Sequence, residues 1–275
     1  MKNHVTRFLM LGAAASLLGA CSPRVYLPDR VNAPMLREQG DVRLTMSSKI
    51  QGNGNTNKFT MSPSLDFAAS PVNGLGLMAS YRHTNRYANE DDIFDSVTDP
   101  DSIHYSGNRL ELGAGYYMPF GSKGLFEIYG GGGWGDFNRD NIKENASFDA
   151  NFQTRYYMFF IQPALGFYTR DVFELSGGIR FAYHKYNYFH GDSMMRYKLT
   201  DPHSNIESTS FMFVDPYINL NVGYQYVKFN MQMGANVCAS TPQIVYGDLP
   251  FYVSLGLTFQ LSPRFGGGSN KTGKE

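Results

Sequence analysis

The sequence predicts an all-β protein, an antiparallel up-and-down transmembrane β-barrel of ten strands, with eight strands as the alternative. Three observations predict it. Aromatic residues make up 15% of the chain and are accompanied by 29 glycines, while the mean hydropathy stays negative at −0.33. Apolar and polar residues alternate from about residue 41 onward, which is the two-residue period of strands. The connections between these segments are alternately short and long.

Composition argues against three other classes of protein. A helical membrane protein needs apolar runs of about 20 residues, and a disordered chain is poor in aromatic residues. The formal net charge of zero gives no electrostatic reason to expect a nucleic-acid partner.

Residues 1–20 read as a lipoprotein signal peptide. Lys2 and Arg7 come before or at the start of a short apolar stretch, which small residues follow. The run Leu18-Gly19-Ala20-Cys21 resembles the lipobox of bacterial lipoproteins, and this resemblance implies cleavage before Cys21 and acylation of that residue. In that family a Ser after the cysteine favours transfer to the outer membrane, and the lack of an acidic run implies a lipid that faces the periplasm. An ordinary signal peptide with an incidental cysteine is the alternative.

The regions on either side of the alternating pattern read as a tether and a tail. Residues 21–40 contain three prolines and no strand or helix period, which predicts an extended, lipidated N-terminal tether. Residues 41–262 form the predicted barrel, and residues 263–275 form a flexible C-terminal tail. With Cys21 acylated, Cys238 has no partner for a disulfide.

Each predicted strand has one uncharged, largely apolar face. The ten strands fall at residues 42–50, 59–69, 75–81, 110–120, 126–134, 157–167, 173–183, 212–224, 227–237 and 251–261. Their opposite faces carry six basic and five acidic residues, namely Arg43, Lys49, Arg82, Arg109, Arg180 and Lys228 with Asp66, Glu111, Glu127, Glu174 and Asp215.

The polar faces and the connections favour a membrane barrel over a soluble sandwich. The polar faces are crowded with glycines such as Gly113, Gly131 and Gly178, which suit a narrow lumen better than a solvated sheet surface. Short turns alternate with long loops near residues 51–58, 84–108, 138–154, 185–210 and 238–250. Outer-membrane barrels have short periplasmic turns, and an even strand number places both termini in the periplasm.

The last predicted strand is a third feature that favours a membrane barrel, besides the glycine-rich faces and the alternating connections. Residues 254–261 resemble the β-signal by which outer-membrane barrels are recognised for insertion, although Leu261 stands where the final aromatic residue is usual. Together with the lipobox and the aromatic outer rows, residues 41–262 resemble the small outer-membrane β-barrel proteins of Bacteroidota. The resemblance implies a location in the bacterial outer membrane, in contact with its lipid. The aromatic residues are expected in two girdles, with Tyr81 and Trp134 in the outer one and Phe67 and Phe120 in the inner one.

Three prolines on the outward rows conflict with a closed sheet. Pro63, Pro163 and Pro216 each remove a ladder hydrogen bond. We expect β-bulges at these positions, and strands broken there would give the eight-stranded alternative.

The inward charges predict a closed lumen. They are nearly balanced, and an eight- to ten-stranded barrel is only wide enough for side chains to fill it. Because unpaired buried charges are costly, we expect a salt-bridged plug. A narrow pore is the alternative.

An enzyme is not predicted, although ten-stranded outer-membrane barrels include the omptin proteases. Asp91, Asp92 and Asp95 in one loop, with His184, His190 and Asp192 near another, resemble the omptin residue types but not the omptin motifs. No nucleophile, base and orienting group can be assigned together. No cofactor or metal is predicted either, and the acidic loop 85–108 is interpreted as solvated rather than as a calcium site.

Three serines resemble acceptors of the Bacteroidota O-glycosylation system, in which Asp precedes the Ser and an aliphatic residue or Met follows it. They are Ser96, Ser102 and Ser193, all in predicted loops.

The remaining expectation is an interaction role. A barrel is already fixed in the bilayer, so an acyl anchor adds little membrane affinity. Aromatic and Met residues in the loop 185–210 are of the kind enriched at protein interfaces. We therefore expect a non-enzymatic accessory or structural subunit that binds other outer-membrane proteins of a larger assembly for secretion, uptake or barrel assembly.

Overall fold

A computed structural model describes residues 29–51, 60–90, 101–141, 151–169, 172–191, 210–239 and 251–262. The predicted signal peptide, the lipidation site Cys21, the C-terminal tail and the candidate acceptors Ser96 and Ser193 lie outside these residues. So do Asp91, Asp92, Asp95 and Asp192.

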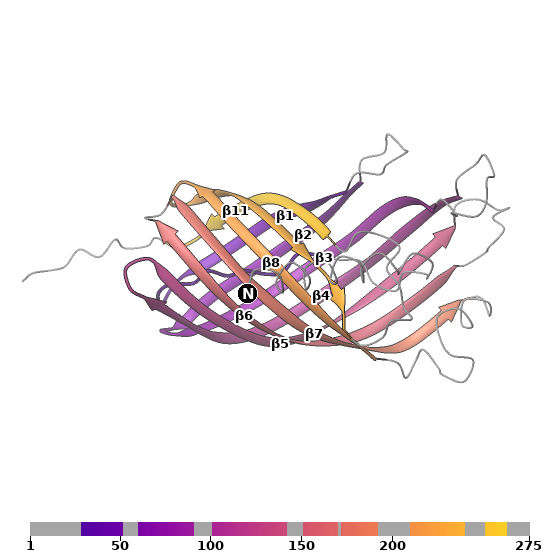
Figure 1. The fold of residues 1–275 in the computed structure, drawn as a ribbon, viewed down its shortest axis with the longest axis horizontal. Coiled ribbons are helices and arrows are strands. Elements are labelled where there is room, and N and C mark those ends of the chain that lie inside the picture. The colour runs from indigo at the N-terminus through magenta and orange to yellow at the C-terminus, as the bar shows by residue number, and fades with distance from the viewer. Residues whose placement is uncertain are drawn as a thin grey trace, which may run out of the picture.

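The described chain forms one closed antiparallel barrel (Figure 1). The strands are β1 (Val42–Gln51), β2 (Thr60–Val72), β3 (Leu75–Glu90), β4 (Asp101–Phe120), β5 (Gly124–Asn141), β6 (Phe152–Thr169), β7 (Phe173–Gly191), β8 (Ser210–Gly223), β9 (Val227–Ala235), β10 (Val237–Cys238) and β11 (Phe251–Gln260). No helix among the described residues is long and apolar enough to cross a membrane.

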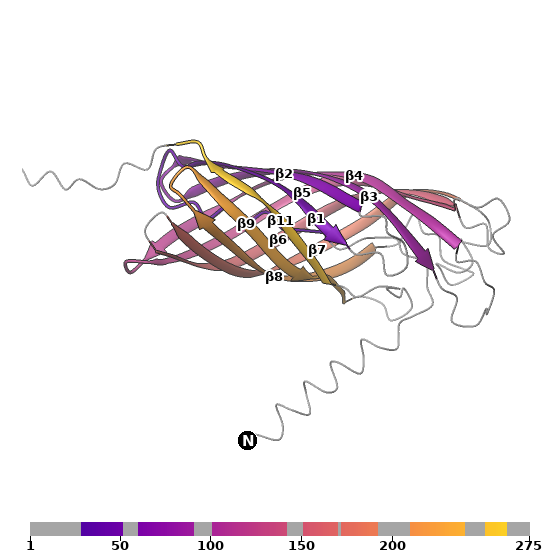
Figure 2. The same cartoon turned by 90° about the horizontal axis from the view of Figure 1, so that it is seen from above.

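Ten strands make the wall, as the main prediction states, and the eight-stranded alternative is wrong. Each strand from β1 to β9 pairs with the next, and β11 pairs with both β9 and β1 to close the ring. The two-residue β10 continues β9 after Asn236 and pairs with the same neighbour, β8. Figure 2 shows β9, β11 and β1 side by side along the seam.

Short turns gather at one end of the barrel. Gly74 and Gly121 lie in two of these turns with φ of 80° and 58°, a left-handed conformation that glycine adopts without a Cβ clash. The first and last strands meet at the same end, where the Val42 N–H donates to Ser262 Oγ at 2.9 Å and the Leu261 N–H donates to the Val42 carbonyl at 2.8 Å. In outer-membrane barrels the short-turn end faces the periplasm.

Strands β3 to β7 are longer than predicted, so three of the predicted loops are too long. Residues 84–90, 101–108, 138–141, 152–154 and 185–191 belong to strands. The pairing of Asn89 with Ser102 places this candidate glycosylation site on β4 instead of in a loop. The outward faces of these extensions carry polar residues such as Asp136 and Asn138. Their inner faces carry aromatic residues such as Tyr105 and Phe152, so the polarity of the two faces is the reverse of that in the membrane part. The outward apolar row that marks the predicted strands therefore stops before the strands end.

The outer face carries the two expected aromatic rows. Toward the long-loop end, Trp134 pairs with Tyr157 on the neighbouring strand, and both are about half exposed. Toward the short-turn end, Phe67, Phe120 and Phe167 are similarly exposed on the outside. Apolar side chains cover the wall between the rows, as lipid contact requires.

The three prolines are accommodated without bulges, which corrects the expectation. Pairing of β2 with β3 stops at Ser64, next to Pro63, and pairing of β8 with β9 stops at Tyr217, next to Pro216. Between β6 and β7 the ladder is interrupted around Pro163 and resumes in the same register. Proline has no N–H to donate, and at each of these positions the ladder on one side is interrupted, so no donor is required there. The strands therefore accommodate the prolines without the extra residue of a β-bulge.

Inward glycines make room for neighbouring side chains. A Cβ on Gly131 would lie 2.7 Å from Gly113 Cα and 2.7 Å from the Phe160 ring, and would also meet the Leu112 carbonyl oxygen. The predicted reason for the glycine-rich inner face, a narrow lumen, therefore agrees with the packing.

Candidate functional site

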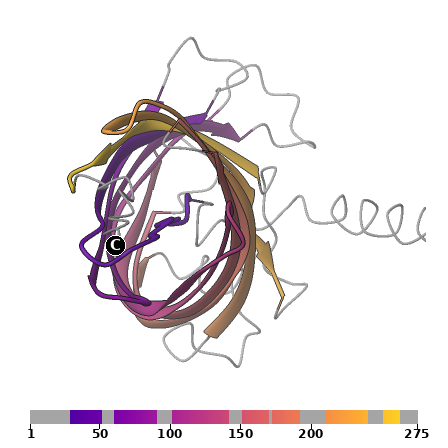
Figure 3. The same ribbon diagram turned by 90° about the vertical axis from the view of Figure 1, so that its left-hand side faces the viewer.

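The N-terminal segment of residues 29–40, here called the plug segment, runs through the lumen. Figure 3, which looks along the barrel, shows this indigo segment inside the ring of strands. Arg30, Val31, Asn32, Met35 and Leu36 are at most 3% exposed. The segment lacks helix and strand, as predicted, but the interpretation of residues 29–40 as a tether outside the barrel is wrong.

The plug segment runs from the loop side of the lumen toward the short turns. Asp29 lines a small cavity with Asp136 and Phe137 of β5. The N–H groups of Met35 and Leu36 reach Glu127, on the same strand but closer to the short turns. Beyond them, the Gly40 N–H donates to the Ser70 carbonyl at 2.8 Å, beside the start of β1.

Side chains of the wall bind the plug backbone. The Val31 N–H donates to Gln232 Oε1 at 2.7 Å, and Gln232 Nε2 donates back to the Val31 carbonyl at 2.8 Å. Gln162 Nε2 donates to the Asn32 carbonyl at 2.7 Å. These primary amides satisfy peptide groups that have no strand neighbour inside the lumen.

The turn at Met35 is held on both sides. The Glu127 carboxylate accepts the N–H groups of Met35 and Leu36, each at 3.1 Å, while Arg43 Nη1 donates to the carbonyls of Pro34 at 2.8 Å and Met35 at 3.1 Å. Met35 adopts a φ of 54°, a left-handed conformation that is unusual for a residue with a Cβ. The two wall side chains therefore fix a backbone bend that the plug sequence does not favour by itself.

One carboxylate collects cations from three segments near the short-turn end. Glu174 accepts Arg43 Nη2 at 2.6 Å and Lys228 Nζ at 2.6 Å, and it also pairs with Arg37 of the plug segment. The Arg37 guanidinium lies 3.8 Å from the centroid of the Tyr168 ring. This cluster ties the plug segment to the wall electrostatically, through a carboxylate that is fully buried and an Arg37 side chain that is 10% exposed.

A second and a third ion cluster lie closer to the middle of the lumen. Asp66 accepts Arg82 Nη1 at 2.7 Å and pairs with Arg30 Nε of the plug segment at 3.0 Å. Glu111 pairs with Arg109 Nε at 2.8 Å and Arg180 Nη1 at 2.9 Å.

The structure places all ten residues of the predicted charge network inside the barrel and buried, together with Lys49. Eight of the ten fall into the separate clusters of Glu174, Asp66 and Glu111, whereas Glu127 binds the plug backbone. Asp215, predicted to belong to the network, accepts a hydrogen bond from the Asn236 amide.

The loop-side half of the lumen is filled by aromatic rings. Tyr105 stacks on Phe137 with a centroid distance of 5.7 Å, and Phe152 stacks on Phe189 at 5.8 Å. His184 lies fully buried among these rings, 5.0 Å from Tyr156. It is therefore inside the lumen and not at the rim, where the comparison with omptin residues placed it.

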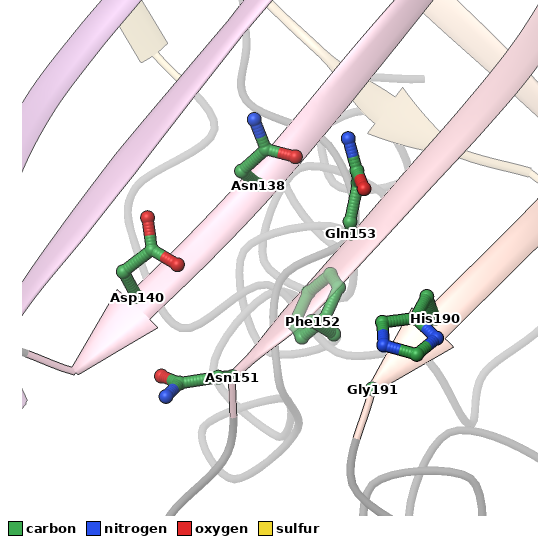
Figure 4. Close-up of a pocket in the computed structure, with 7 residues that line it drawn as sticks. All are labelled: Asn138, Asp140, Asn151, Phe152, Gln153, His190 and Gly191. Carbon is green, nitrogen blue, oxygen red and sulfur yellow. The ribbon is translucent and has the colours of Figure 1, made fainter.

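A polar pocket of about 540 Å³ lies at the loop end of β5, β6 and β7. Its lining residues, drawn in Figure 4, are Asn138, Asp140, Asn151, Phe152, Gln153, His190 and Gly191. His190, the second candidate histidine, lines this pocket together with Asp140. Among the residues that the structure describes, no group of three or more His, Cys, Asp or Glu side chains could hold a metal ion.

Sequence reasoning missed the plug side of the site. Asp29, Arg30 and Arg37 belong to it, as do the inward amides Gln162 and Gln232. One signal was present in the sequence. Within nine residues the predicted tether contains two arginines, one aspartate and the apolar pair Met35-Leu36, and a solvated spacer needs neither charged nor apolar side chains.

Comparisons with known proteins give no family. The chain matches no protein-family model, and no curated protein matches it. Solved structures with similar folds include the translocator domain of the autotransporter NalP from Neisseria meningitidis, with 10% identity, a TM-score of 0.47, and coverage of 82% of this chain and 90% of that one. An outer membrane channel from Pseudomonas putida F1 has 10% identity, a TM-score of 0.42, and coverage of 84% and 98%.

A third similar structure is OmpT, an outer membrane protein of Vibrio cholerae, with 7% identity, a TM-score of 0.26, and coverage of 81% of this chain and 99% of that one. The fold of the present chain follows from its own closed strand pairing and not from these likenesses. It is a ten-stranded barrel of the outer-membrane type, with an apolar outer wall and a polar lumen.

Proposed function

We propose that this chain is a non-enzymatic outer-membrane lipoprotein whose barrel is closed by its own plug segment, and that it serves as an accessory or structural subunit of a larger outer-membrane assembly. The assembly would act in secretion, uptake or barrel assembly. The lipid on Cys21 and a Bacteroidota source belong to this proposal, on the strength of the lipobox and the β-signal alone.

The binding of the plug segment carries the proposal of a closed lumen. Wall side chains satisfy the plug backbone at Val31, Asn32, Met35 and Leu36, and buried carboxylates pair with its two arginines. Buried charges and peptide groups are costly unless they are paired. Expelling the segment would remove Arg30 from Asp66, Arg37 from Glu174 and the two plug N–H groups from Glu127, so a closed resting state is favoured over a narrow pore.

The accessory role is proposed because the barrel does not need the acyl anchor to stay in the membrane. Strands with an apolar outer wall hold the protein in the bilayer, so the acyl anchor is available for other contacts. Tyr186 and Phe189, two of the aromatic residues in the predicted loop 185–210, are buried inside the lumen and add nothing to such a contact surface. An omptin-like protease, the other alternative, has less support because His184 is enclosed by aromatic rings.

Co-purification tests the accessory role. The native protein would be extracted from its own membrane in a mild detergent and analysed by size exclusion and mass spectrometry. We expect a defined complex with at least one other outer-membrane protein. A protein that remains monomeric and without partners at native expression levels would contradict the role.

A further inference from the structure

The outermost described part of the plug segment lies at the level of the outer aromatic row. Asp29 shares a small cavity with Thr84 of β3, Arg109 of β4 and Asp136 of β5. The outer aromatic row includes Tyr81 on β3 and Trp134 on β5. On β4 its level is given by Leu110, which pairs with both of these residues. The neighbours of Asp29 are therefore within three residues of that row along each strand, at the outer boundary of the apolar wall.

From Asp29 the chain runs inward only. Its later residues contact the wall progressively closer to the short turns, at Glu127, then Glu174, then Ser70. The space beside them is taken, because Arg30, Val31, Met35 and Leu36 are almost completely buried. A second passage of the same chain back through this part of the lumen has no room.

The length of the chain between Cys21 and Asp29 also favours an exit on the long-loop side. Cys21 precedes Asp29 by eight residues, which span at most about 26 to 29 Å when fully extended. On β4 the short-turn end at Phe120 is eleven residues from Arg109, or roughly 28 Å along the barrel axis for a strand tilted by about 40°. An unobstructed and fully extended path would only just reach the periplasmic mouth, whereas the outer boundary is already at Asp29.

We propose that the plug segment threads the barrel and that the mature N-terminus with Cys21 emerges on the cell surface, on the side of the long loops. The acyl chains on Cys21 would then enter the membrane from its outer face. This inference replaces the expectation of a periplasm-facing lipid and of two periplasmic termini. It does not depend on an accessory role, because it follows from the direction of the plug segment.

Epitope tags test the topology. One variant carries a short tag between Arg24 and Val25, a second carries it after Glu275, and a third carries it in the loop between Asn145 and Ala146. Each is labelled with antibody on intact and on permeabilised cells. We expect the N-terminal and loop tags to be labelled on intact cells to a similar extent, and the C-terminal tag only after permeabilisation.

An N-terminal tag that stays protected on intact cells while the loop tag is labelled would overturn the proposal. A difference in migration on SDS gels between unheated and heated samples verifies that each tagged barrel is folded. The untagged protein gives an independent readout: trypsin added to intact cells should cleave after Arg24, and mass spectrometry should find the barrel shortened at its N-terminus. An uncut Arg24-Val25 bond in cells whose loops are cleaved would also contradict the proposal.

Discussion

Gln232 and Val31 exchange two hydrogen bonds, although 201 residues separate them in the chain. The Gln232 amide acts as both acceptor and donor toward one peptide unit of the plug segment, at 2.7 and 2.8 Å, and its Oε1 also accepts the Tyr252 hydroxyl at 3.0 Å. The Gln232 side chain therefore supplies to Val31 the hydrogen-bond acceptor and donor that a neighbouring strand supplies to a residue in a sheet. Because Gln232 is fully buried, both bonds are made without competition from water.

Replacing Gln232 with Leu should destabilise the folded barrel. The substitution keeps the volume but leaves the Val31 N–H and carbonyl buried without these partners, at an expected cost of about 2 to 4 kcal/mol. The measurement is the temperature at which the folded band disappears on SDS gels. Met233→Leu is the matched control, because Met233 is the next residue on β9 and faces outward; equal melting of the two variants would contradict the role of Gln232.

Glu174→Gln should be more damaging. It leaves Arg37, Arg43 and Lys228 around an uncharged amide, and removing one partner of a buried ion cluster costs about 3 to 5 kcal/mol. We expect a lower yield of folded barrel and a lower melting temperature. Adding Lys228→Met to this variant removes one surplus cation and should restore part of the loss, so a double variant no better than the single one would refute the electrostatic explanation.

Neighbouring glycines on β5 should respond differently to alanine. Gly131→Ala adds a methyl that must displace backbone atoms of β4 and the Phe160 ring, and such overpacking typically costs about 1 to 3 kcal/mol. Gly130→Ala is expected to be nearly neutral, since the nearest atom to its Cβ is the Phe160 carbonyl oxygen at 3.7 Å. Thermal melting of the two purified variants makes the comparison, and equal losses would show that the inner face is less crowded than described.

The barrel was predictable from the sequence because its signal is repeated in every strand. The same alternation placed Arg82, Glu111 and Glu174 on the inner face, where the structure has them. Strand ends were harder to predict: around Asn138 and His190 the outward face becomes polar, while aromatic residues such as Phe152 and Phe189 take the inner face. The outward apolar row by which the strands are predicted therefore ends before the strands do.

The plug segment could not be predicted, for a different physical reason. Its peptide groups are satisfied by Gln162, Gln232 and Glu127, which come from distant strands. An extended segment bound in this way has no periodicity of its own, and its proline content looks like that of a linker. Only the closed barrel brings together the side chains that make Asn32 and Met35 interior residues.

Conductance in planar lipid bilayers tests the central claim, that the barrel is closed by its own chain. The purified full-length protein is compared with a variant that lacks residues 22–36. We predict that the full-length protein gives no steady current, whereas the shortened variant, once shown to be folded by its heat-dependent gel shift, gives discrete open levels. A steady open current through the full-length protein would contradict the account.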